Sequence, residues 1–173
     1  EYNTLLEEQT LHDGQDLRAY RPLRTAAGAM RPLDLPVGGL LRLKGAHVTV
    51  DGLPASPGDA ELVIAPGARI QVTLLWECLA EMEESYTVFV HLLGEDNHLV
   101  TQHDGTPLFG TRPTRLWLPG EQLLDRHDLA VPREVHVSKA WLLVGLYNSE
   151  TLARQLFGDG RDAMLLADVR FAR

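Results

Sequence analysis

The sequence predicts an all-β protein, an antiparallel two-sheet β-sandwich of jelly-roll or immunoglobulin-like type with little helix. Two observations carry this prediction. From Val37 onward, short apolar runs recur every ten to fifteen residues or so and are separated by Gly, Pro, Asp and Asn, which is typical of sandwich strands and their turns. No stretch has the length and the 3.6-residue apolar period of a long amphipathic helix, so an α/β fold would lack its helices.

The clearest single strand is residues 70–76, where Ile, Val, Leu and Trp occupy every second position. The other strands are predicted where short runs of aliphatic, β-branched or aromatic residues end at turn residues. They span residues 41–43, 48–50, 62–65, 86–93, 98–104, 122–129, 141–147 and 164–171. Only residues 79–85 (LAEMEES) suggest helix, and they suffice for a turn or two.

Residues 86–104 predict a hairpin with its turn at residues 94–97. If Leu93 pairs with His98, alternate side chains form one apolar face and one mixed polar face. The expected core face holds Tyr86, Val88, Val90, Leu92, Leu99, Thr101 and His103. The expected polar face holds Thr87, Phe89, His91, Leu93, His98, Val100, Gln102 and Asp104.

Two domain segments are expected. Residues 1–36 form an extended N-terminal arm or linker, because their Arg, Ala and Pro residues follow neither strand nor helix spacing. Such an arm could also wrap the domain. Residues 37–173 form the sandwich domain.

Composition argues against several classes of partner. Asp and Glu outnumber Lys and Arg by 24 to 16, and a net charge of −8 opposes binding to a nucleic-acid backbone. The longest apolar runs are far below the 18 residues or so of a membrane span, so no direct membrane insertion by this segment is expected. Cys78 is the only cysteine, which rules out an intrachain disulfide and a thiolate zinc cage and favours a small buried side chain.

The seven histidines do not have metal-ligand spacing. The sequence contains neither His-x-His nor His-Glu-x-x-His, and the expected hairpin places His91 and His103 on opposite faces. No transition metal and no other cofactor is therefore expected. A Ca²⁺ ion stays open as an alternative, because sandwich loops can supply oxygen ligands. The candidate ligands are Asp96, Asn97, Asp104 and Asp125.

Motifs for catalysis are absent as well, so an enzyme is not expected. The sequence has no Gly-x-Ser-x-Gly elbow and no phosphate-binding loop. A glycoside hydrolase-like pair of carboxylates, Asp104 and Asp125, remains a weaker alternative.

Several aromatic residues suggest carbohydrate binding, since a pyranose offers an apolar face and a rim of hydroxyl groups. Trp117 and Tyr147 lie close to turns, and His91, Gln102 and Asp104 would supply hydrogen-bonding groups beside them. The competing interpretation is that the tryptophans belong to the core and that the polar row is a structural network. Burial distinguishes the two: inaccessible, mutually bonded His91, Asp104 and Asp125 would favour the structural interpretation.

The order of the motifs adds a resemblance. The series comprises APG (65–67) before residues 70–76, YTVFVHLL (86–93), VTQHDG (100–105) with Pro107, PT (113–114), WLPGE (117–121), Leu124-Asp125, and GLYN (145–148) with Thr151 and Arg154. It resembles the extracytoplasmic C-terminal β-sandwich domains of bacterial glycosyltransferase- or mannosyltransferase-like membrane proteins, over roughly residues 37–173. The chain departs from the usual Asp-Pro-like turn with Asn148-Ser149.

The resemblance implies an extracytoplasmic, cell-surface domain tethered to the membrane-embedded part of its parent protein. The recurrent positions map onto His91, Gln102, Asp104, Pro107, Trp117, Pro119, Gly120, Asp125, Gly145, Tyr147 and Arg154. The expected function is a non-catalytic accessory or binding domain, with a glycan as the ligand. The candidate ligand-binding residues are His91, Gln102, Asp104, Trp117, Asp125, Tyr147 and Arg154. The alternative is a purely structural or protein-interaction sandwich.

Overall fold

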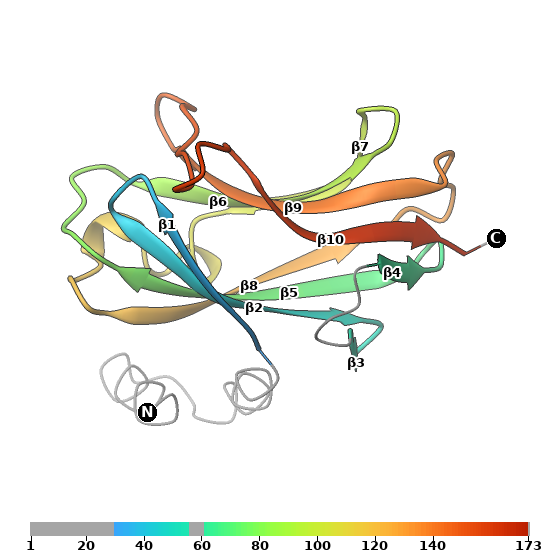
Figure 1. Ribbon diagram of the computed structural model, residues 1–173, viewed down its shortest axis with the longest axis horizontal. Helices are drawn as coiled ribbons and strands as arrows, with labels where there is room; N and C mark the ends of the chain where they lie inside the picture. The colour runs from blue at the N-terminus through green and yellow to red at the C-terminus, as the bar shows by residue number, and fades with distance from the viewer. Residues whose placement is uncertain (1–29, 56–60, 173) are drawn as a thin grey trace.

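The structure, a computed structural model, describes residues 30–55 and 61–172. In this part of the chain, ten strands form two five-stranded sheets that pack face to face (Figure 1). The strands are β1 (Arg31–Val37), β2 (Leu41–Val50), β3 (Leu53–Pro54), β4 (Glu61–Ile64), β5 (Arg69–Cys78), β6 (Tyr86–Gly94), β7 (Leu99–Gly105), β8 (Gln122–Ala130), β9 (Lys139–Asn148) and β10 (Met164–Phe171). The predicted all-β sandwich is confirmed.

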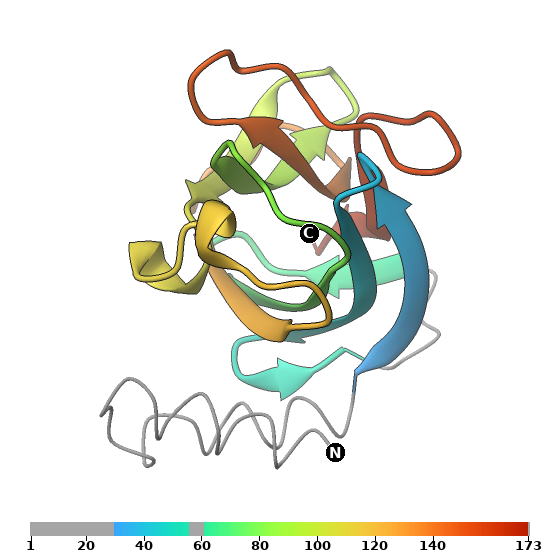
Figure 2. The same cartoon turned by 90° about the vertical axis from the view of Figure 1, so that its left-hand side faces the viewer.

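The two sheets are named sheet A and sheet B. Sheet A has the strand order β1-β2-β5-β8, with β3 paired to β2, and sheet B has the order β4-β10-β9-β6-β7. Every pair is antiparallel except β4 and β10, which run parallel. Strands β7 and β8 lie at the edges of different sheets, and the connection between them (residues 106–121) runs along one side of the sandwich (Figure 2).

The core lies between the sheets and follows the period-two pattern of the sequence. The inward residues of β5, which include Val72, Leu74 and Trp76, have no exposed surface. Leu142 and Val144 of β9 face them from sheet B and are equally buried. Removing these side chains from water is the main force that holds the layers together.

The hairpin of β6 and β7 has the predicted faces over most of its length, with one local difference. His91 pairs with Gln102, so both stand on the same face. The predicted pairing of Leu93 with His98 is wrong, because Leu93 pairs with Leu99 and Val100 is the extra residue of a β-bulge. The bulge turns Leu99 to the outer face and lets Val100 pack against the core.

Two further expectations differ from the structure. Residues 31–36, assigned from the sequence to the arm, form most of β1; residues 1–29 of that arm lie outside the described residues. Residues 79–85 form no helix, and the amides of Leu79 and Ala80 instead donate to the Leu40 carbonyl.

Short 3-10 turns occur at Leu108–Gly110 and Thr114–Leu116, both within residues 106–121. No helix among the described residues is long and apolar enough to cross a membrane.

Candidate functional site

The outer face of sheet B brings together side chains from β6, β7 and β9. Phe89 of β6 pairs with Asp104 of β7 on one side and with Gly145 of β9 on the other. A Cβ atom on residue 145 would lie 2.3 Å from Cζ of Phe89, so the ring occupies the space that a side chain would fill. The glycine in β9 thus allows the Phe89 ring to lie flat on the sheet.

Asp104 is the centre of a hydrogen-bond network on this face. Its Oδ1 accepts from Nε2–H of His91 at 2.9 Å, and its Oδ2 accepts from the hydroxyl of Tyr147 at 3.2 Å. The side chains of His91 and Asp104 are 14% and 26% exposed, so a ligand can reach both. Burial, and next the negative charge of Asp104, raise the pKa of Tyr147, which keeps its hydroxyl a donor.

Arg154 covers the ring of Phe89, which lies beside this network. Its guanidinium lies 4.7 Å from the centroid of Phe89, and its Nη1 donates to Oδ2 of Asp162 at 3.0 Å. Tyr147 stacks on the same ring with centroids 6.2 Å apart, and its strand forms an isolated bridge to Arg154. Phe89 is only 1% exposed, so the accessible groups are the polar rim and Arg154 rather than the ring itself.

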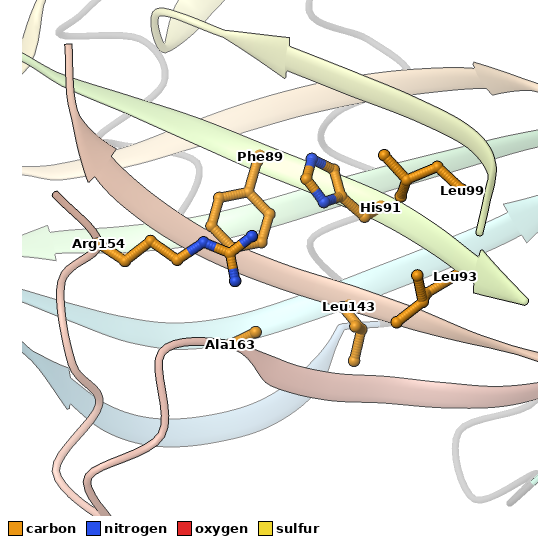
Figure 3. A pocket seen from close by; sticks show the side chains of 7 residues that line it. All are labelled: Phe89, His91, Leu93, Leu99, Leu143, Arg154 and Ala163. Carbon is orange, nitrogen blue, oxygen red and sulfur yellow. The ribbon is translucent and has the colours of Figure 1, made fainter. Parts of the chain in front are cut away.

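A pocket of about 180 Å³ opens beside this network (Figure 3). In Figure 3 the Arg154 side chain crosses Phe89 at one end, and the leucines lie at the other. The pocket is lined by Phe89, His91, Leu93, Leu99, Leu143, Arg154 and Ala163. The bulge in β7 contributes to it, because only the shifted register brings Leu99 to this face. The lining is thus mainly apolar, with one cation and one imidazole.

Five of the seven candidate residues lie in or beside this region. They are His91, Gln102, Asp104, Tyr147 and Arg154. Trp117 and Asp125 lie elsewhere, in the interior, and are 1% and 2% exposed. Trp117 Nε1–H donates to the Arg112 carbonyl and so holds residues 106–121 in shape.

Asp125 belongs to a polar chain between the sheets that the sequence did not reveal. Its Oδ1 accepts from the amide of Leu108 at 3.0 Å, and its Oδ2 accepts from Nε2–H of His127 at 2.7 Å. Nδ1 of His127 in turn lies 2.8 Å from Nδ1 of His103. Leu108 has a positive φ of 54°, so this contact stabilises a backbone conformation that side chains disfavour. One sequence signal existed, since the alternation of the hairpin places His103 on its core face.

The residues considered for other chemistry lie apart. Asp96 and Asn97 are in the β6–β7 turn, Asp104 is on the outer face of sheet B, and Asp125 is in the interior. Asp104 and Asp125 therefore face no common cleft. Within residues 30–55 and 61–172, no group of three His, Cys, Asp or Glu side chains could hold a metal ion.

Comparison with known proteins yields a likeness in fold. No family model and no curated protein matches the sequence. Among solved structures, the fold is similar to the C-terminal domain of wzt, with a TM-score of 0.55, 10% identity, and coverage of 84% of this chain and 81% of that one. At this identity the likeness concerns the fold alone. The comparisons give no membership in a glycosyltransferase family.

Proposed function

We propose that this protein is a non-catalytic accessory domain that binds carbohydrate on the outer face of sheet B. One observation carries the proposal: the Asp104 network and an apolar pocket of about 180 Å³ lie side by side on the outer face of sheet B. His91 belongs to both.

This combination suits a sugar. A pyranose has an apolar face of C–H groups and equatorial hydroxyls that both donate and accept hydrogen bonds. Asp104 is an acceptor, Gln102 is both donor and acceptor, and Arg154 retains guanidinium donors beyond the one bound to Asp162. The leucines and Ala163 would contact the C–H groups.

The order of sequence motifs supports an extracytoplasmic location for the domain, tethered to the membrane-embedded part of its parent protein. The glycan would then be a cell-surface or lipid-linked one. The net charge of −8 favours a neutral over an acidic glycan, because like charges repel.

A second candidate function is a structural or protein-interaction sandwich. It is favoured by the fact that both carboxylate oxygens of Asp104 already have partners within the protein. A ligand on this face would then have to share or displace existing hydrogen bonds.

A glycan array probed with three forms of the chain separates the two candidates. Leu99→Asp places a charge at the pocket rim, where the leucine is 47% exposed, so the fold should tolerate it. Leu53→Asp is the matched control, since Leu53 lies on β3 of sheet A and is 72% exposed.

We expect the wild-type chain and the Leu53→Asp variant to bind the same glycans. Leu99→Asp should bind them at least about tenfold more weakly, which corresponds to a loss of about 1.4 kcal/mol of binding free energy. The absence of any bound glycan with the wild-type chain, or equal binding by Leu99→Asp, would contradict the proposal.

A further inference from the structure

The outer face of sheet A carries a pair of apolar residues at positions where a two-layer sandwich usually has polar side chains. Leu75 of β5 and Leu124 of β8 are directly paired across the strands. Their chain neighbours Leu74 and Leu123 point into the core with no exposed surface, so Leu75 and Leu124 point outward. Both are nevertheless buried, at 3% and 5% exposure, in a cluster separate from the core.

The buried outward area extends beyond the two leucines. Thr73 is the next outward residue of β5 and pairs with His47 of β2. They are 1% and 7% exposed. A buried patch therefore crosses three neighbouring strands on the face of sheet A that lies away from sheet B.

Met30, the residue before β1, packs on this patch. Among the described residues, it is Met30 that packs on Leu75 and Leu124. Its sulfur lies 2.7 Å from where a Cβ on Gly45 would be, and Gly45 pairs with Leu75. The missing side chain of Gly45 thus leaves room for Met30. Met30 therefore lies on the outer face of sheet A.

We propose that residues 1–29 dock on the outer face of sheet A and cover Leu75 and Leu124. This segment continues directly from Met30 and has six large apolar residues between positions 5 and 23. They are Leu5, Leu6, Leu11, Leu17, Tyr20 and Leu23. Because the segment is tethered next to the patch, its effective concentration there is on the order of millimolar, so a modest apolar contact suffices.

A second copy of the chain fits this patch less well. Two chains of net charge −8 repel each other, and a stable interface buries about 800 Å² on each partner, far more than two leucines and a methionine offer. The inference is independent of the proposed carbohydrate site, which lies on the opposite sheet.

Thiol labelling of an engineered cysteine tests the docking in the full chain. Leu124→Cys reports on the covered patch, and Asp128→Cys, outward on the same strand with a side chain 51% exposed, is the matched control. Cys78, which has no exposed surface, becomes reactive only when the domain opens and so reports on folding.

Each reporter is placed in the natural arm and in an arm in which all six apolar residues become serine. A further control arm replaces Asn3, Glu7, Glu8, Gln9, Gln15 and Arg21 by serine. With the natural and control arms, we expect the thiol at residue 124 to react with a maleimide at least about tenfold more slowly than the thiol at residue 128. With the serine arm the two rates should become similar while Cys78 stays protected.

Two outcomes would overturn the inference. Equal rates at residues 124 and 128 with the natural arm would mean that the patch is bare. Continued protection of residue 124 with the serine arm would assign its cover to something else, and a dimer in sedimentation would identify that cover as a second copy.

Discussion

His103 of β7 and His127 of β8 join the two sheets through one hydrogen bond of 2.8 Å between their Nδ1 atoms. The direction of this bond follows from Asp125. Since Nε2–H of His127 donates to the Asp125 carboxylate, Nδ1 of neutral His127 is the acceptor and Nδ1–H of His103 is the donor. The rings meet edge to face at 76°. The interior of the sandwich therefore contains an ordered chain of three polar side chains.

The first prediction concerns pH. Burial, and next repulsion from His127 when that ring is protonated, lower the pKa of His103 below its usual 6.5, against the opposing effect of Asp125, Asp128 and Asp104. The unfolded state then binds a proton more readily than the folded state, so stability is full above about pH 7.5 and falls as the pH drops through about 6.5. Urea denaturation between about pH 7.5 and 5.5 should show this fall, and His103→Gln should flatten it. An identical slope in the variant would contradict the assignment to His103.

The second prediction concerns the close approach of Gly145 and Phe89. Gly145→Ala should destabilise the fold by about 1–3 kcal/mol, because the new methyl group would overlap the ring of Phe89. Phe89→Leu removes the overlapping Cζ, so the double variant should be less destabilised than the two single variants added together. Chemical denaturation of all four proteins in a double-mutant cycle measures this coupling. Additive losses would mean that the ring is not the cause.

The third prediction concerns the anchoring of residues 106–121. Oγ1 of Thr114, a residue with no exposed surface, accepts the Tyr86 amide at 2.8 Å. Thr114→Val should cost about 1–3 kcal/mol, because it leaves that buried amide without an acceptor. Thr111→Val removes an exposed hydroxyl from the same connection and should change stability by no more than about 0.5 kcal/mol. Equal effects in urea denaturation would refute the anchoring role of Thr114.

The features that depend on the local alternation of side chains could be predicted from the sequence. The inward face of β5 was predictable, and so was the shared face of His91, Gln102 and Asp104, because side chains alternate regardless of small register errors. The bulge at Leu99 depends on how two strands twist around each other, which their own residues do not reveal.

The burial of Trp117 and Asp125 was beyond local patterns for a different reason. Residues 106–121 hold both side chains in place. The path of this connection from sheet B to sheet A depends on contacts between residues far apart in the sequence. Likewise, His103 and His127 are 24 residues apart, and their meeting depends on the two edge strands being brought together. From the sequence, the alternation of the hairpin indicated only that His103 faces inward.

The central claim is that a glycan binds on the outer face of sheet B, and a backbone chemical-shift titration tests it most directly. The uniformly ¹⁵N-labelled chain would be titrated with the glycan that the array selects. We expect saturable shifts in β6, β7, β9 and around Arg154, and their loss in Leu99→Asp. Saturable shifts confined to sheet A or to residues 106–121, or no saturable shifts at all, would contradict the account.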